Sequence, residues 1–143
     1  MAKCTSKLPE ELLKKLSRVG SNMDKIAESA LKAGGEVVLK KTKSNLTSMV
    51  KGPSSGQLVN ALGLSPVLVD RNGNYNIKVG FDEYRDDGSS NAMVANIIEY
   101  GKHGQPARPF LKNAKNSSKK ECEETMARKI EEEIDKLWIF YLN

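Results

Sequence analysis

Histidine and cysteine are scarce in this chain of 143 residues, which has one histidine (His103) and two cysteines (Cys4 and Cys122). A structural zinc site needs four closely arranged Cys or His ligands, so this composition predicts no metal centre. The N-terminus lacks the apolar stretch of a secretory signal, so we expect folding in a cytoplasm and reduced thiols. No apolar run approaches the roughly 18 residues that a membrane span needs, so no membrane partner is expected.

Enzyme signatures are also missing. Neither of the glycine-rich phosphate-binding motifs, G-x-x-x-x-G-K-[ST] and G-x-G-x-x-G, occurs in the sequence. His103 lies in a turn between two glycines, with no identifiable partner to orient it as a general base. The acidic cluster of Asp82, Glu83, Asp86 and Asp87 lacks the ligand spacing of a calcium loop. We therefore predict no enzyme, no catalytic residue and no cofactor, and interpret the acidic cluster as a solvated loop able to meet a basic partner.

The net charge of +5 is unevenly distributed along the chain. Residues 1–51 hold 11 basic and 5 acidic residues, residues 52–111 hold 5 and 6, and residues 112–143 hold 7 of each. A basic helix can contact phosphates or an acidic protein ring, although a solvated helix surface is the more ordinary interpretation.

The strongest candidates for contact with DNA are three lysines near the end of the first predicted helix: Lys40, Lys41 and Lys43. Lysine contacts phosphates without reading base sequence, so any DNA binding here would be non-specific.

Apolar residues recur at helical steps of three and four from residue 12 to residue 38, after a Pro9 suited to a first helical turn. This pattern predicts a long helix over residues 9–50, either continuous or as two nearly collinear helices that meet at Gly20. Ser21 is a candidate cap for the second of these. Gly34 lies on the apolar stripe, which predicts a close backbone contact there.

A β-hairpin is predicted over residues 65–81, after a short helical turn over residues 54–63. In its second strand Tyr75, Ile77, Val79 and Phe81 share one face, and Asn72-Gly73 between the two runs is a strong turn signal.

A polar loop is predicted over residues 82–90, and Asn91 is a candidate cap for the segment 91–100. Met93, Val94, Ile97 and Ile98 fit helical spacing in this segment better than alternation, although a strand stays an alternative. The last helix is predicted over residues 109–141, with a long apolar stripe and a charged opposite face. Together these elements predict one α+β domain over residues 1–143: a long N-terminal helix, a small antiparallel sheet and an amphipathic C-terminal helix packed on it.

Two neighbouring segments are distinctive: residues 91–101, which end in Ile-Ile-Glu-Tyr-Gly, and residues 105–114, which contain Pro-Ala-Arg-Pro-Phe-Leu. They resemble the gene-product-ten-like minor tail family of long-tailed phages and prophages, which also carries an upstream Gly-x-Leu motif. The sequence departs from the family pattern at Lys102-His103, where many members have Thr, and at Val59, where many have a basic residue. The matching residues are Gly56, Leu58, Glu99, Tyr100, Gly101, Pro106, Arg108, Pro109 and Phe110.

Each motif residue also has a physical interpretation. Gly101 can end a helix in a left-handed conformation, and Pro106 and Pro109 stiffen the link to the next helix. Glu99 stands at a helix C-terminus, where the helix dipole disfavours an anion, so it needs a partner, and Arg108 is the nearest candidate. A packing corner is the favoured interpretation of this element over a direct interface.

The resemblance implies a structural virion protein that completes or joins the tail at the head–tail interface, synthesised in the bacterial host cytoplasm. It implies an oligomeric ring, often hexameric, with the head connector and the tail tube or terminator proteins as partners and transient contact with DNA. The candidate interface residues are Asp82, Glu83, Asp86 and Asp87, together with the hairpin edge. The alternatives are a non-specific DNA-binding protein and, less favoured, a hydrolase or nuclease.

Overall fold

The computed structural model describes residues 2–3, 22–51, 55–82 and 84–142. The predictions on Cys4, Pro9, Gly20 and Ser21 therefore fall outside the described residues, as does the prediction on Glu83. The elements are β1 (Ala2–Lys3), α2 (Met23–Met49), α3 (Ser55–Asn60), β2 (Leu62–Leu64), β3 (Leu68–Val69), β4 (Tyr75–Asn76), β5 (Lys78–Phe81), α4 (Asn91–Tyr100) and α5 (Phe110–Leu142).

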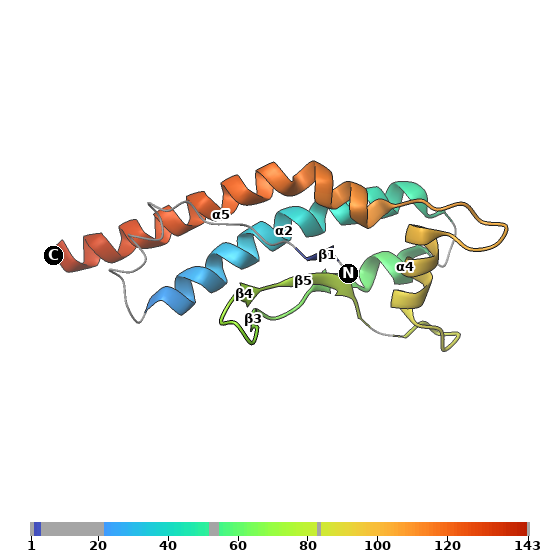
Figure 1. Cartoon of the computed structure of the whole chain (residues 1–143), viewed down its shortest axis with the longest axis horizontal. Coiled ribbons are helices and arrows are strands. Elements are labelled where there is room, and N and C mark those ends of the chain that lie inside the picture. The colour runs from blue at the N-terminus through green and yellow to red at the C-terminus, as the bar shows by residue number, and fades with distance from the viewer. Residues whose placement is uncertain (1, 4–21, 52–54, 83, 143) are drawn as a thin grey trace.

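The two long helices, α2 and α5, lie side by side and run antiparallel, and strands β2 to β5 lie on the α2 side of this pair (Figure 1). Strand β1 also contacts α5. At one end the Asn45 side-chain amide of α2 donates to the carbonyl of Phe110, the first residue of α5, at 3.3 Å. Towards the other end Ile26 of α2 and Ile134 of α5 belong to the same buried cluster. The arrangement confirms the predicted α+β class.

Two adjacent glycines allow α2 to pack on both sides. A Cβ on Gly34 would lie 2.5 Å from Met126 Cγ of α5, and a Cβ on Gly35 would lie 3.1 Å from Leu64 Cδ2 of β2. The predicted close contact at Gly34 is confirmed, and Gly35 adds a second contact that the stripe did not indicate. Successive helical residues point about 100° apart, so one glycine faces α5 and the next faces the sheet.

The larger sheet has the strand order β1-β5-β2, and both pairs are antiparallel. In the β2–β5 pair Leu62 lies opposite Phe81 and Leu64 lies opposite Val79. The prediction of a helical turn over residues 54–63 is right for α3 and wrong at its end, because residues 62–64 pair with β5 as a strand.

The predicted hairpin is confirmed between β3 and β4, where Leu68 pairs with Asn76 and Val69 with Tyr75. It is shorter than predicted, since the chain after Asn76 continues as β5 in the other sheet. The turn has three residues between Asp70 and Asn74, whose backbones bond at 2.9 Å, and Gly73 takes a φ of +81°. This is the three-residue type of hairpin loop that ends in a left-handed glycine.

Buried side chains form two clusters. One joins α2, α5 and the sheet through residues such as Ile26, Val38, Ile77 and Met126. The other lies where α2 ends and α5 begins, and consists of Leu46, Leu58, Ala95, Ile98 and Phe110. Phe81 packs against both clusters and meets Phe110 edge to face, with ring centroids 6.1 Å apart. The two cores are therefore continuous through β5.

Candidate functional site

The helix α4 spans Asn91–Tyr100, the predicted range, and begins with a side-chain cap. Ser90 is the cap, and its hydroxyl accepts from the Met93 N–H at 3.4 Å. The prediction that Asn91 caps the helix is wrong. Asn91 is instead the first helical residue, and its buried amide donates to the Asp82 carbonyl at 3.3 Å and accepts from Arg85 at 3.5 Å. It therefore ties the polar loop to α4.

The helix predicted from the spacing of Met93, Val94, Ile97 and Ile98 is confirmed. Its inward face carries Ala95, Ile98 and Glu99, which are buried, whereas Met93 is exposed. A ten-residue helix that packs against its neighbours along a narrow line leaves one apolar side chain outside.

Gly101 ends α4 in a conformation that requires glycine. Its φ is +77° and its ψ is 174°, a region that is essentially restricted to glycine. A Cβ there would also lie 2.8 Å from both the Ala107 nitrogen and the Gln105 carbonyl oxygen. The predicted left-handed conformation is right in its positive φ and wrong in ψ, which is extended. The close approach of the returning chain is a second reason for glycine at this position.

The chain reverses direction directly after Gly101. Lys102 and Gln105 exchange two backbone hydrogen bonds, at 3.0 and 2.9 Å, around a turn made by His103 and Gly104. The Arg108 N–H then donates to the Ile98 carbonyl at 2.7 Å. The Glu-Tyr-Gly and Pro-Ala-Arg-Pro-Phe-Leu segments therefore lie against each other, and His103 is an exposed turn residue.

Glu99 connects α4 to α5. Its side chain is only 5 % exposed, and its carboxylate accepts from the N–H groups of Leu111, at 2.8 Å, and Lys112, at 3.0 Å. These are free N–H groups of the first turn of α5, at the positive end of its dipole. Glu99 has a partner, as predicted, but the predicted pairing with Arg108 is wrong. The helix terminus satisfies the carboxylate in place of a cation.

Arg108 bonds to α2, away from Glu99. Its guanidinium Nη1 donates to the carbonyl of Met49, the last residue of α2, at 2.8 Å. A cation is favourable at a helix C-terminus, where the last carbonyls lack intrahelical donors. We call the unit formed by Glu99, Gly101, Arg108 and Phe110 the corner. Its side chains join α2, α4 and α5 at one point.

Phe110 fills the space under the corner. It is completely buried with Leu58 and Ile98. Gly56 has open space around its Cα and no positive φ, so nothing in the structure explains glycine there. Tyr100 is 74 % exposed and contributes to neither core cluster. Of the resemblance motif, Leu58 and Phe110 therefore contribute apolar packing, whereas Tyr100 faces solvent.

The polar loop contains a tight turn. Arg85 and Ser89 bond through their backbones at 2.8 Å, and Gly88 takes a φ of +80°. Asp86 accepts from the Gln57 amide of α3 at 2.6 Å. Hydrogen bonds from Ser89 are the main reason that the pKa of the Asp87 carboxyl lies below its ordinary value, so Asp87 is charged at neutral pH. The described acidic residues of the loop, Asp82, Asp86 and Asp87, are all exposed.

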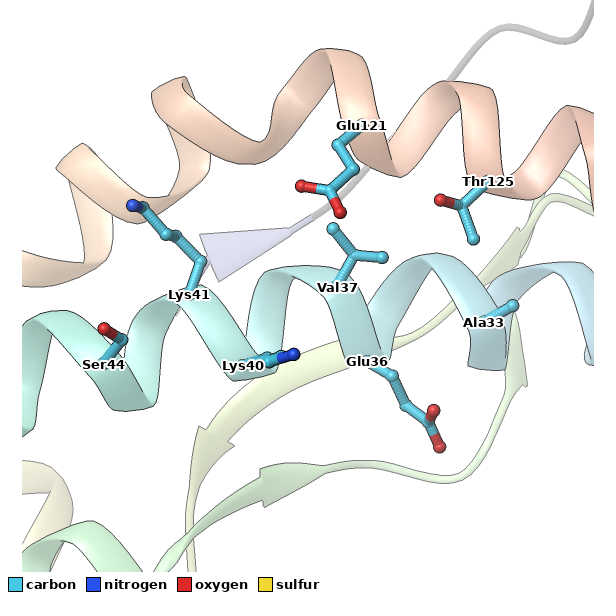
Figure 2. Close-up of a pocket in the computed structure, with 8 residues that line it drawn as sticks. All are labelled: Ala33, Glu36, Val37, Lys40, Lys41, Ser44, Glu121 and Thr125. Carbon is cyan, nitrogen blue, oxygen red and sulfur yellow. The ribbon is translucent and has the colours of Figure 1, made fainter.

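Two of the three candidate DNA-contact lysines lie in a groove between α2 and α5 (Figure 2). Lys40 and Lys41 line this groove of about 580 Å³ together with Glu36 and Glu121. Lys43 does not line it. Two lysines and two glutamates leave the groove with no net formal charge, an arrangement that does not favour a phosphate backbone.

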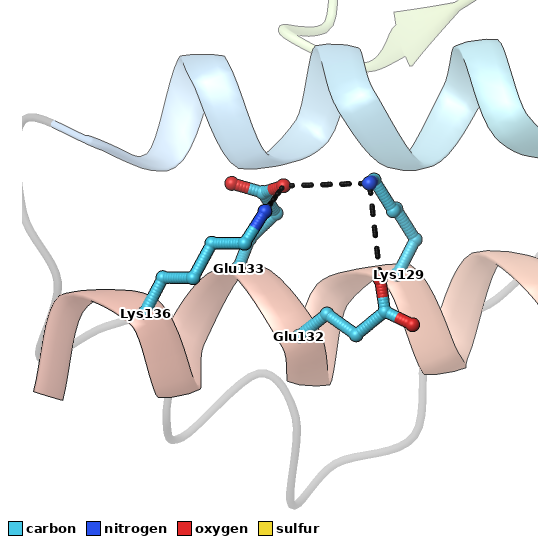
Figure 3. A network of polar contacts seen from close by, with 4 residues as sticks. All are labelled: Lys129, Glu132, Glu133 and Lys136. Carbon is cyan, nitrogen blue, oxygen red and sulfur yellow. Dashed lines mark hydrogen bonds and ion pairs between the residues drawn. The ribbon is translucent and has the colours of Figure 1, made fainter. Parts of the chain in front are cut away.

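Charged side chains of α5 pair beside its buried stripe, where Lys129 and Glu133 are half-buried. Lys129 pairs with Glu132 at 3.8 Å and with Glu133 at 3.6 Å, and Lys136 pairs with Glu133 at 3.3 Å (Figure 3). Such pairs within one helix contribute only about 0.2–0.5 kcal/mol each. They support a long solvated helix and do not define a binding site.

Metal ligands do not gather anywhere in the described part of the chain, where no three His, Cys, Asp or Glu side chains are placed to hold an ion together. None of its helices is long and apolar enough to cross a bilayer.

Comparison with known families identifies the class of protein. Residues 10–101 match the family described as "Bacteriophage HK97-gp10, putative tail-component". The match covers more than half of the chain, so the protein belongs to this family, and the resemblance inferred from its motifs is confirmed. The matched range ends at Gly101 and includes α2, the strands from β2 to β5 and α4. Neither the curated proteins nor the solved structures give a match.

Proposed function

We propose that this phage tail component completes the tail at the head–tail interface as a hexameric ring, with residues 1–143 as one domain. The proposal is carried by the family match together with the corner, which holds α2, α4 and α5 in one rigid unit through Glu99 and Arg108. A rigid unit keeps its surfaces in a constant relation, which repeated contacts around a ring require. In this role the protein acts by binding other virion proteins.

In this proposal each copy contacts its neighbours sideways, the head connector on one side and the tail tube or terminator on the other. The candidate contact surfaces are the β3–β4 hairpin and the loop that contains Asp82, Glu83, Asp86 and Asp87. Two observations support them. Within the described chain β3 pairs only with β4, so its outer edge is open, and an open edge favours pairing with another chain. The loop presents its described carboxylates to solvent.

Deletion of the gene tests the proposal. The expected result is full heads and separate tails in electron micrographs of the lysate, and joined particles after wild-type protein is supplied from a plasmid. Joined, infectious particles that form without the protein would contradict the assignment. A Lys119→Ala variant, changed at an exposed position of α5, should restore joining as fully as wild type.

Non-specific DNA binding through Lys40, Lys41 and Lys43 is the rival function. The glutamates that share the groove with Lys40 and Lys41 give it no support. Strong duplex binding with a steep salt dependence, combined with normal tails after deletion, would favour the rival.

A further inference from the structure

Among the residues that the structure describes, exposed large apolar side chains gather at two surfaces, and Met23 stands apart from both. The first, which we call the α4 face, consists of Tyr84, Met93 and Tyr100, which are 79, 54 and 74 % exposed. Met93 and Tyr100 lie seven residues apart, so they share one side of the helix. Tyr84 is bridged to Ser90, the residue that caps the Met93 N–H, and therefore lies beside the first turn.

The second surface, which we call the hairpin face, is the outer edge of β3, where Leu68 and Val69 are 44 and 58 % exposed. As successive strand residues their side chains point to opposite sides of the hairpin. Among the residues that the structure describes, this edge of β3 pairs with no other strand. In Figure 1, β3 and α4 lie on opposite sides of β5, well apart along the molecule. The two faces therefore cannot cover each other within one chain.

The charges beside the two faces are of opposite sign. Exposed Asp86 and Asp87 lie in the turn between Tyr84 and Ser90, at the start of α4. The neighbouring Arg85 is half-buried, contacts Asn91 and also interacts with the Asp87 carboxylate, so the loop keeps two exposed carboxylates beside one half-buried cation. Lys102 lies beyond the other end of α4, which confines the acidic character to the Tyr84 end.

The exposed charge at the hairpin tip is a cation. Arg71 is exposed there, whereas Asp70 is half-buried and its carboxylate accepts from the N–H groups of Asn72 and Asn74 at 2.8 and 2.9 Å. An apolar strand edge beside an exposed cation thus forms one surface, and an apolar patch beside exposed carboxylates forms the other.

We propose that the occupant of the α4 face is a second copy of this chain, which places the edge of β3, with Val69, against Met93 and Tyr84, and Arg71 near Asp86 and Asp87. The inference rests on the proposed ring and names its lateral contact. Two different surfaces meet in this contact, so it is heterologous, and a heterologous contact repeats around a ring until it closes. The exposed charges of each face are of one sign, which disfavours a symmetric pairing of like faces.

Disulfide trapping tests the contact in assembled particles. In a Cys4→Ser background, the Val69→Cys and Met93→Cys substitutions are placed in one chain, and particles are analysed on non-reducing gels. The remaining native thiol of Cys122 is buried. The expected result is a ladder of multiples of the monomer that needs both substitutions. The control chain carries Lys119→Cys with Met93→Cys and should remain monomeric.

Charge exchange provides an independent readout. Arg71→Glu should lower the yield of the ladder at least about tenfold, because like charges would face each other across the contact. Adding Asp86→Arg and Asp87→Arg to the same chain should restore the ladder. Arg128→Glu, at an exposed position of α5, is the matched control and should leave the yield unchanged.

The outcomes separate this inference from the proposed function. Joined particles that contain the protein but show no ladder and no charge rescue would overturn the contact and leave the tail-completion role intact. Dimers from Val69→Cys alone or from Met93→Cys alone, at the yield of the double variant, would show a symmetric contact and also overturn it. Absence of the protein from particles would overturn both.

Discussion

A buried carboxylate without a cation is the central chemical feature of the corner. Desolvation of an unpaired charge is costly, so the Glu99 side chain persists in the interior only because two N–H groups of α5 donate to it. The same N–H groups would otherwise lack partners at the start of the helix. The same two hydrogen bonds thus stabilise the buried Glu99 charge and give acceptors to the first N–H groups of α5.

Glu99→Gln should lower the free energy of unfolding by about 1–3 kcal/mol, since the amide keeps the size of the side chain but loses the charge that the two donors stabilise. Urea unfolding followed by far-UV circular dichroism measures the change. Glu124→Gln is the control, because Glu124 is exposed and its pair with Lys120 is 4.0 Å long, so its effect should stay within about 0.5 kcal/mol. Equal effects of the two substitutions would show that Glu99 does not hold the corner.

Gly101→Ala should destabilise the fold by more than about 2 kcal/mol, because alanine would have to adopt a glycine-only conformation and its Cβ would meet two backbone atoms of the returning chain. Gly104→Ala is the matched comparison: Gly104 also has a positive φ, of +78°, but nothing lies within 4 Å of a Cβ placed there. Its cost should be only about 1 kcal/mol, from the backbone alone. Thermal unfolding of both variants checks the difference, and a Gly101 variant as stable as the Gly104 variant would contradict it.

Among the helices and strands, α2 contacts α5, the sheet and the corner. It packs on α5 through Gly34 and on the sheet through Gly35, and its end receives Arg108 from the corner. Buried Thr42 of α2 and Ser118 of α5 bond to carbonyls of their own helices, at 2.7 and 2.6 Å. Both long helices therefore carry buried small polar side chains that bond within their own helix.

The two glycines of α2 should respond differently to alanine. Both substitutions gain about 1 kcal/mol of helix propensity. Gly34→Ala should nevertheless be destabilising by about 1–3 kcal/mol, because its Cβ overlaps Met126 in a packed helix contact. Gly35→Ala meets the half-buried Leu64 at 3.1 Å, which can shift, so it should be neutral or stabilising by up to about 1 kcal/mol.

Chemical denaturation of the two single variants and of Gly34→Ala combined with Met126→Ala tests this account. The combined variant should lose less stability than the sum of its parts, since the shorter side chain removes the overlap. Additive losses would show that the overlap is not the cause.

The whole molecule carries its surface charge in separate regions. The loop that contains Asp82, Asp86 and Asp87 is acidic, whereas the groove of Lys40 and Lys41 is balanced by glutamates. Charge placed on one side of a subunit affects assembly more than it affects folding, because exposed charges contribute little to stability.

Reversal of Asp82, Asp86 and Asp87 to lysine should therefore lower the yield of infectious particles at least about tenfold while the chain stays folded. Complementation of a deletion strain measures the yield, and circular dichroism of the purified variant verifies the fold. Reversal of Glu131, Glu132 and Asp135 on the outer face of α5 changes the charge equally and should leave the yield close to wild type. Intact assembly with the reversed loop would count against its role as an interface.

Local signals in the sequence were sufficient for several features of this protein. The bounds of α4, the positive φ of Gly101, the buried stripe of α5 and the close contact at Gly34 all follow from the spacing of apolar residues and from glycine stereochemistry. The family resemblance likewise depended on short motifs, and a match over residues 10–101 confirms it.

Other features were decided only by the tertiary structure. Leu62–Leu64 is a strand because β5 lies beside it, and that pairing joins residues far apart in the chain. Glu99 was assigned to Arg108, yet it bonds to backbone N–H groups of α5, which no side-chain pattern reveals. The spacing of residues along the chain determines local conformation. The hydrogen-bond partners of a buried side chain depend instead on which helix ends and strands the packing brings beside it. The order of residues alone does not specify this packing.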